Sequence, residues 1–198
     1  DNLTVTDVLA LRSERLQNMA LGPDGSRMPE GAAFLGLFPR DENGDGVTEV
    51  PEAREMQRFD EEGERQYYVV WRQYSADGTA ADVQSCYHNV EDGWNLKLPE
   101  EWSKAKLAAE RTVGADESAV SFYRVSASGR RSKVLTIYRL TGSMREELAG
   151  LGDRFTLTRQ VEAVYAAEIG DIWNVQLTEQ SLRDRFSLIM AEWVMGDN

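Results

Sequence analysis

The chain is poor in the residues that build covalent cross-links and soft-metal sites. Its 198 residues include one cysteine and one histidine. A single cysteine excludes an internal disulfide framework and a multi-cysteine zinc site. Cys86 and His88 lie two positions apart, so on a strand their side chains would point to the same face. A catalytic nucleophile and its base need such proximity. No third catalytic member is evident, and a small buried thiol is the favoured interpretation of Cys86.

Long apolar runs and positive charge are also scarce. No stretch of about 18 apolar residues is present, so the sequence predicts no membrane insertion. Asp and Glu number 34 against 22 Lys and Arg, a formal net charge of −12. Because nucleic-acid binding needs clustered Lys and Arg, we expect no nucleic-acid partner. Apolar residues make up 41% of the chain, which is enough for a hydrophobic core.

Alternating apolar and polar residues predict several strands. Aromatic and β-branched residues at 67–74 lead into an Asp77-Gly78 turn, a pattern typical of a hairpin. A second hairpin is predicted with arms at 119–125 and 133–140. Further strands are predicted over 3–11, 33–40 and 94–98, and two more within 155–169.

Helical patterns separate these strands. Helices are predicted over 99–113, 141–152 and 178–193, and weakly over 51–58; a loop is predicted over 22–32. Ser143 and Thr178 are candidate N-caps. The last helix would present one apolar face, made of Leu182, Phe186, Ile189 and Trp193. The order of elements predicts an α+β fold, an antiparallel β-sheet packed by helices.

The most informative motif is RDENGDGVTEVPE at 40–52. Asp41, Asn43 and Asp45 place oxygen-bearing side chains at alternate positions, and Gly46 permits a sharp bend. Calcium takes six to eight oxygen ligands, several of them carboxylates. The Val47 carbonyl and the Glu49 carboxylate are further candidate ligands.

Three interpretations of this motif remain open. Glu52 stands at the twelfth position, where an EF-hand loop carries a bidentate glutamate. An EF-hand, however, has an apolar eighth residue and a helix on each side, whereas this loop has Thr48 and then Pro51. A calcium loop between strands is the second interpretation. The third is an acidic Asx-type turn that binds no metal.

The segment DENGDGVTEV resembles the calcium loop of FG-GAP/VCBS-type β-propeller repeats, D-x-[DN]-x-D-G-x-x-[DE] followed by an apolar residue. In that family the loop joins strands. The resemblance implies one structural Ca²⁺ bound by Asp41, Asn43, Asp45, the Val47 carbonyl and Glu49. It covers the loop alone, and no second copy is present, whereas a propeller needs several blades.

A second resemblance covers more of the chain. The segments YHNVEDGWNLKLPEEW, SFYRV, VLTIYRLTG and TEQSLRDRFSLI resemble the C-terminal part of uncharacterised secreted or lipid-anchored proteins (lipoproteins) of Gram-positive gut bacteria. The opening strand followed by P-x-x-W (Pro99 to Trp102) and the late amphipathic helix also resemble the PsbP/Mog-like α/β/α fold. In that fold the chain after the tryptophan continues as turn and strand, an alternative to helix over 103–113. The resemblance implies an extracytoplasmic location, at the cell surface or secreted, with any signal or anchor outside this sequence. It also implies a non-catalytic role.

These observations predict two regions. Residues 1–85 would form a β-rich region with a partial propeller-type repeat and the acidic loop, and 86–198 an α/β sandwich domain. The expected function is a non-catalytic binding or structural module that recognises an unknown protein or glycan ligand. The alternative is a hydrolase acting on cell-wall or dietary polysaccharide, because paired carboxylates can cleave glycosidic bonds. Its candidate residues are Glu91, Asp92, Glu100 and Glu101, with Trp94 and Trp102 as cleft-lining aromatics.

Overall fold

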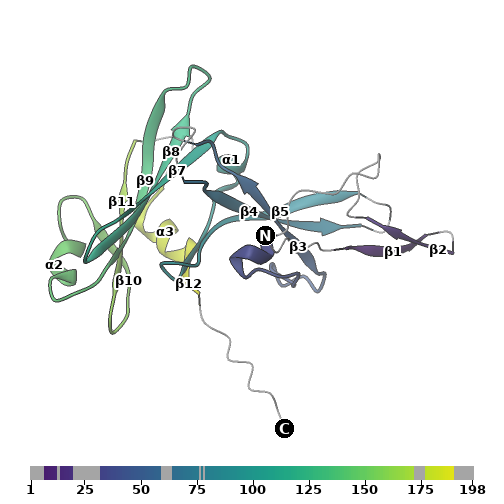
Figure 1. Cartoon of the computed structure of the whole chain (residues 1–198), viewed down its shortest axis with the longest axis horizontal. Helices are drawn as coiled ribbons and strands as arrows, with labels where there is room; N and C mark the ends of the chain where they lie inside the picture. Colours follow the sequence, from purple (N-terminus) through teal and green to yellow (C-terminus); the bar gives the residue numbers. More distant parts are fainter. Residues whose placement is uncertain are drawn as a thin grey trace, which may run out of the picture.

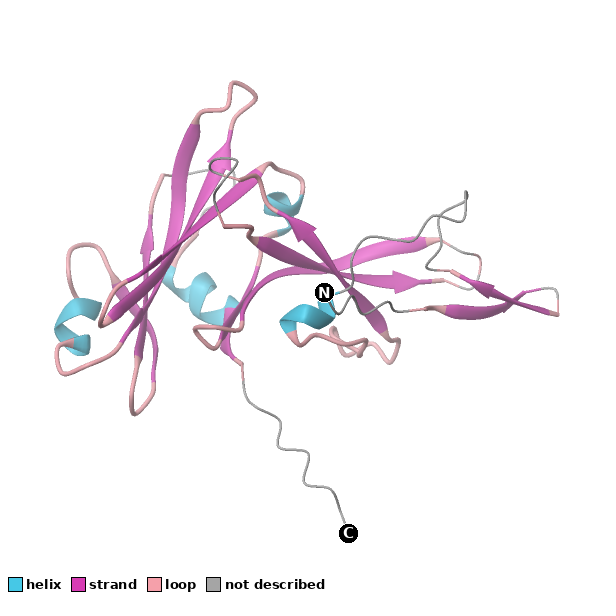
Figure 2. Ribbon diagram, in the orientation of Figure 1, coloured by secondary structure: helices cyan, strands magenta, loops and turns pink. Residues whose placement is uncertain are grey.

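The computed structural model describes residues 7–12, 14–19, 32–58, 64–75, 77, 79–171 and 177–189. This part of the chain is mostly β-strand. It forms a two-stranded hairpin and two five-stranded antiparallel sheets, with three short α-helices and one 3-10 helix (Figures 1 and 2). The predicted α+β fold, with helices packed on one sheet in the PsbP/Mog-like manner, is therefore wrong. Strand pairing extends through segments whose local sequence favours helix, and sheet packs on sheet.

The first five-stranded sheet has the order β12–β6–β5–β4–β3. Its strands are β3 (Glu49–Glu55), β4 (Tyr67–Tyr74), β5 (Ala80–Asn89), β6 (Trp94–Lys97) and β12 (Phe186–Leu188). We call it the loop-bearing sheet, because β3 follows the acidic loop directly. The predicted hairpin across the 77–78 turn is confirmed as β4 and β5. The predicted boundary between 1–85 and 86–198 falls inside β5, and β12 comes from the far end of the chain, so both regions contribute to this sheet.

The second sheet has the order β10–β11–β9–β8–β7. Its strands are β7 (Leu107–Val113), β8 (Glu117–Val125), β9 (Arg131–Leu140), β10 (Phe155–Arg159) and β11 (Val164–Ile169). The predicted hairpin of 119–125 with 133–140 is confirmed as β8 and β9, and the two strands within 155–169 as β10 and β11.

The helix predicted over 99–113 is wrong beyond its first turn. Helix α1 (Glu100–Ser103) is short, and the chain then continues as β7, which confirms turn and strand for 103–113. Leu107 and Ala109 alternate into the core while β7 pairs with β8. Burial of this alternating face outweighs the helix propensity of an alanine-rich segment.

The two later helices are also shorter than predicted. Helix α2 (Arg145–Ala149) has no side-chain cap, so Ser143 does not cap it. Helix α3 (Glu179–Arg185) begins at the predicted cap, where Thr178 Oγ1 accepts a hydrogen bond from Ser181 N. It ends before Phe186, because β12 pairs with β6 there, and Trp193 lies outside the described residues. No helix in the described part of the chain has the length and apolar character needed to cross a bilayer.

Two predictions around the acidic loop are wrong. Residues 33–40 form the 3-10 helix η1 (Ala32–Leu35) and a loop instead of a strand. Residues 51–55 lie within strand β3, where a weak helix was predicted. Pro51 lacks an amide donor, and it is accommodated because β3 is the edge strand of its sheet. The loop predicted at 22–32 lies almost entirely outside the described residues.

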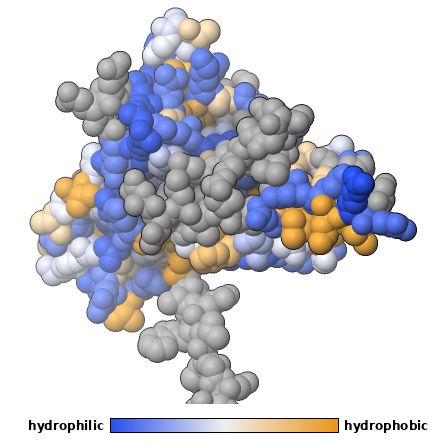
Figure 3. Space-filling view, turned by 45° about the vertical axis from the view of Figure 1, so that its right-hand side comes forward, coloured by the Kyte–Doolittle hydropathy of each residue, from blue (hydrophilic) through white to orange (hydrophobic). Residues whose placement is uncertain are grey.

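A separate hairpin is formed by β1 (Leu9–Arg12) and β2 (Arg15–Asn18). Strand β1 overlaps the end of the strand predicted at 3–11, and β2 follows it. Leu11 lies opposite Leu16, and Leu9 is two positions from Leu11, so the three leucines share one face. All three are exposed, and Figure 3 shows apolar side chains at the end of the molecule that carries this hairpin.

The main core lies between the two five-stranded sheets. Phe122 of β8 packs edge-to-face on Tyr87 of β5, with ring centroids 5.0 Å apart, and lies 6.0 Å from the Trp102 ring. Phe186 of β12 lies against Tyr165 of β11, with ring centroids 5.5 Å apart. Aromatic side chains from both sheets therefore hold the sheets together.

Gly170 directly follows β11, at a point where the chain passes close to the backbone of β9. A Cβ at this position would collide with the carbonyl oxygen of Lys133 and lie 2.9 Å from its carbonyl carbon. Since a backbone carbonyl cannot rotate away, we expect Gly170→Ala to lower the free energy of unfolding by about 2–3 kcal/mol in urea titrations. Gly150→Ala is the matched control, because its Cβ would meet nothing closer than 3.9 Å. Equal losses in the two variants would contradict the close approach.

Candidate functional site

The acidic loop closes on itself between η1 and β3. Arg40 N donates to Glu49 O over 3.1 Å, and Glu49 N donates to Arg40 O over 2.9 Å. Within the ring, Gly44 and Gly46 have φ angles of +81° and +85°, a region that favours glycine. The bend predicted at Gly46 is confirmed, and the loop is a closed ring anchored at the first residue of a strand.

Asp41 organises the turn. Its carboxylate accepts backbone hydrogen bonds from Gly44 N (2.8 Å), Asp45 N (3.1 Å) and Gly46 N (2.9 Å). Asp45 accepts from Val47 N over 2.8 Å. This backbone hydrogen bond, followed by one from the Asn43 side chain, lowers the pKa of Asp45 below its usual value. Asp45 is therefore ionised at neutral pH.

Three carboxylates converge at the mouth of the ring. Asp41, Asp45 and Glu49 each place one oxygen within 4.8 Å of the other two. Glu49 is fully buried, whereas the two aspartates are exposed. Gln73 Nε2 of β4 donates to Asp45 over 3.0 Å and to Glu49 over 3.3 Å, and Glu42 N donates to Glu49 over 2.8 Å.

No basic side chain in the described part of the chain balances the charge of this group. Across the described ranges, no Lys or Arg forms an ion pair with Asp41, Asp45 or Glu49. Neutral amide donors are their partners instead. Three clustered carboxylates whose described partners are neutral donors form a set that suits a hard divalent cation.

The structure thus brings together three of the five predicted ligands. Asn43 lies beside Asp45: its Oδ1 accepts from Asp45 N over 2.9 Å, and its Nδ2 donates to Asp45 Oδ2 over 3.0 Å. Val47 contacts the group through its N–H. Metal binding by the Asn43 side chain and by the Val47 carbonyl stays a prediction, as does binding by Asp41, Asp45 and Glu49.

The EF-hand interpretation is wrong, because the loop leads into a strand. Glu49 and Glu52 are three positions apart in β3, so their side chains point to opposite faces of the sheet. Glu52 accepts instead from Tyr74 Oη over 2.8 Å and from Arg72 over 3.4 Å. Once β3 is recognised as a strand, its period-two alternation separates these two glutamates.

Cys86 and His88 lie on β5, but they do not form an activated pair. Burial raises the pKa of the Cys86 thiol to about 12, so the thiol stays protonated at neutral pH. His88 Nδ1 lies 3.2 Å from Asn95 Oδ1, and desolvation lowers the pKa of His88. The favoured interpretation of Cys86, a small buried thiol, is confirmed.

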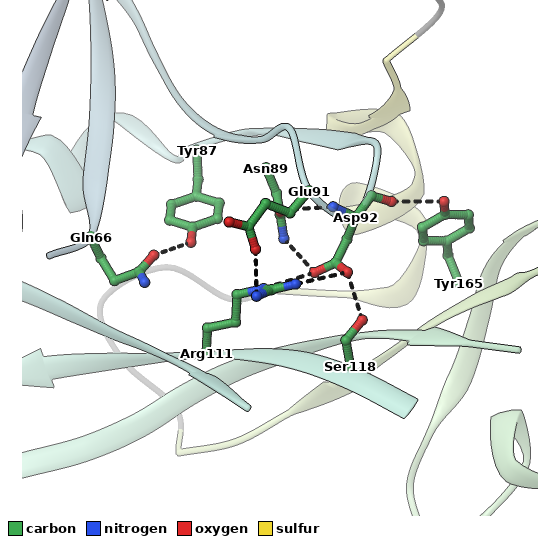
Figure 4. Close-up of polar contacts among 8 residues, drawn as sticks. All are labelled: Gln66, Tyr87, Asn89, Glu91, Asp92, Arg111, Ser118 and Tyr165. Atoms are coloured by element: carbon green, nitrogen blue, oxygen red, sulfur yellow. Dashed lines mark hydrogen bonds and ion pairs between the residues drawn. The ribbon is translucent and has the colours of Figure 1, made fainter. Parts of the chain in front are cut away.

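A second polar cluster joins the two sheets (Figure 4). Asp92, in the turn between β5 and β6, accepts from Ser118 Oγ over 2.7 Å and from Asn89 Nδ2 over 2.9 Å. Two nitrogens of Arg111 also donate to it, each over 3.3 Å, while Arg111 also pairs with Glu91. Sequence reasoning missed Arg111 and Ser118, because 19 and 26 residues separate them from Asp92 and no local spacing signals the contact.

Four of the residues named for a hydrolase have other places and partners in the described structure. Trp94 and Trp102 are each 1% exposed in the core between the sheets, so neither ring is free to line an open surface. Asp92 is neutralised by Arg111, and the exposed Glu100 pairs with Lys104 over 2.5 Å. These contacts explain the residues as parts of the core and its surface.

Comparisons with known protein families, with curated proteins and with solved structures find no match to this chain. The functional proposal is therefore carried by the loop's own geometry: a closed ring, three converging carboxylates and neutral donors around them.

Proposed function

We propose that the loop at 41–49 binds one structural Ca²⁺, and that the chain is a non-catalytic binding or structural module of an extracytoplasmic surface protein. The observation that carries the calcium proposal is the convergence of Asp41, Asp45 and Glu49 within 4.8 Å without a basic partner in the described residues. An ion at this point would replace the missing positive charge. The surface location and the protein or glycan ligand rest on the sequence resemblances.

The donor set favours calcium over softer metals. The grouped atoms are all carboxylate oxygens, whereas zinc and copper sites usually include imidazole or thiolate. Magnesium demands near-ideal octahedral geometry, and calcium accepts irregular sets that include backbone carbonyls. A ten-residue ring with two left-handed glycines offers such an irregular set.

The ion would act on stability. Three like charges held close together repel one another, and a bound divalent cation converts that repulsion into attraction. Gln73 connects two of the carboxylates to β4, so ordering of the loop is transmitted to the edge of the loop-bearing sheet. A protonated thiol at Cys86 and an Asp92 paired with Arg111 are consistent with a non-catalytic role.

Thermal unfolding tests this proposal. Calcium at about 100 times its dissociation constant stabilises the folded state by about 2.7 kcal/mol. For a chain of this size, we expect the melting temperature of EDTA-treated protein to rise by roughly 5–10 °C when CaCl₂ is added. Asp45→Ala should lose this rise, and Asp153→Ala, which removes an exposed carboxylate in another turn, should keep it. An equal rise in wild type and Asp45→Ala would remove the loop from the account.

A further inference from the structure

We propose that the calcium loop latches a strap, residues 32–47, over an apolar face of the loop-bearing sheet, so that calcium release uncovers this face. The inference rests on the proposed calcium site and assigns a regulatory output to it. The device differs from a purely structural site because the strap opens while the two-sheet core stays folded.

The strap covers a cluster of its own, separate from the core between the sheets. Ala32 and Leu37 come from the strap, and Leu35 packs at its margin. The sheet contributes the remaining fully buried members, which are Ala53, Val69, Trp71 and Cys86. Trp71 and Cys86 lie on inner strands of the sheet, and the strap residues pack against them on this face.

Polar contacts fasten the strap at the end nearest the acidic loop. The Arg40 guanidinium lies over the Trp71 ring, 5.0 Å from its centroid. Glu42 accepts from Arg40 Nε over 2.8 Å and from Gln84 Nε2 of β5 over 3.0 Å. The backbone pair of Arg40 with Glu49 then closes the ring. The attachment of the strap and the carboxylate group therefore meet at Glu49, whose backbone pairs with Arg40 and whose carboxylate accepts from Glu42 N.

Loss of the ion would act on this shared end first. Repulsion among Asp41, Asp45 and Glu49 opposes the ring once no cation balances it. Among the described side chains of the strap beyond the ring, Ala32, Leu35 and Leu37 pack on the sheet, whereas the core between the sheets joins many residues from both sheets. Segments with few buried contacts open locally at lower free energy than the whole fold. We therefore expect opening confined to 32–47.

Cys86 provides an unambiguous readout. It is the chain's only cysteine and is 2% exposed beneath the strap. A maleimide reagent can label no other thiol. The rate of labelling in the native state therefore reports how often this face is uncovered.

The first experiment measures maleimide labelling of the whole chain in EDTA and in saturating CaCl₂, with calcium binding measured on the same sample by titration calorimetry. We expect labelling to be about tenfold or more faster in EDTA. Calcium binding with equal labelling rates would overturn the latch and leave the proposed calcium site standing. Absence of calcium binding would overturn both.

Hydrogen exchange distinguishes strap opening from global unfolding. In EDTA, amides of 32–47 should exchange through local opening, at a free energy well below that of the amides of β8 and β9, which lose only the global stability that calcium supplies. Equal opening free energies for the two regions in EDTA would show that the strap opens only by global unfolding, and would overturn the latch.

Leu37→Ala loosens the strap without touching a proposed ligand. We expect this variant to bind calcium and still label about tenfold faster than wild type in CaCl₂. Leu148→Ala is the matched control, because Leu148 is a residue of α2 and packs against a different cluster, on the second sheet. Equal acceleration in the two variants would contradict the role of the strap.

Discussion

Phe122→Ala is expected to lower the free energy of unfolding by about 3–5 kcal/mol. The Phe122 side chain is fully buried, and its ring packs between Tyr87 of the loop-bearing sheet and Trp102. Truncation would leave a cavity at the contact between the two sheets, and neither sheet can close it without disturbing its own strand pairing. Urea unfolding followed by far-UV circular dichroism measures the effect.

Phe38→Ala is the control for this prediction. It removes the same ring from a position that is 61% exposed, so we expect a change below about 0.5 kcal/mol. If the two phenylalanines cost the same, the two sheets would not share the core described here.

Asp92→Ala has the second large expected effect, a loss of about 3 kcal/mol in the free energy of unfolding. Asp92 is buried and receives hydrogen bonds from Ser118, Asn89 and Arg111. Removing the carboxylate leaves these donors without their acceptor in a site with little access to water. Glu91→Gln is the control, because Glu91 contacts the same Arg111 from a side chain that is 62% exposed, where an ion pair contributes less than about 1 kcal/mol.

The same carboxylate predicts a pH dependence. Burial disfavours the charge on Asp92, but hydrogen bonds from Arg111, Ser118 and Asn89 outweigh burial and lower its pKa below the usual value. A lowered folded-state pKa gives stability that is present above the unfolded pKa, about 3.9, and is lost as pH falls through the folded value. The stability difference between wild type and Asp92→Asn should therefore be constant near pH 7 and shrink below about pH 4. A difference that stays constant down to pH 2 would contradict the lowered pKa.

Local patterns in the sequence predicted the strongest hairpins. At 67–74, and again at 119–125 with 133–140, β-branched and aromatic arms flank turn residues, and both hairpins are present. The failures lie where propensity and tertiary pairing disagree. Residues 103–113 are rich in helix formers, yet Leu107 and Ala109 alternate into a core that no local window reveals. The edge position of β3, which accommodates Pro51, is likewise set by strands far along the chain.

The candidate site was also predictable only in part, because its ligands are close in sequence and its other partners are not. Alternate oxygen-bearing side chains and a glycine bend lie within ten residues, so Asp41, Asp45 and Glu49 could be named together from the sequence. The partners that define their environment are distant. Gln73 reaches the group from β4, and Gln84 holds Glu42 from β5, contacts that only the strand register creates. The strap over Cys86 was invisible for this reason, because 33–40 reads as a strand when taken alone.

Calorimetric titration of the EDTA-stripped protein with CaCl₂ tests the central claim most directly. The account predicts saturable binding of one ion per chain with a dissociation constant at or below about 1 mM, as in extracellular calcium modules. Asp45→Ala should abolish the binding, and Asp153→Ala should retain it. The absence of saturable binding in wild type, or undiminished binding in Asp45→Ala, would contradict the assignment of a calcium site to residues 41–49.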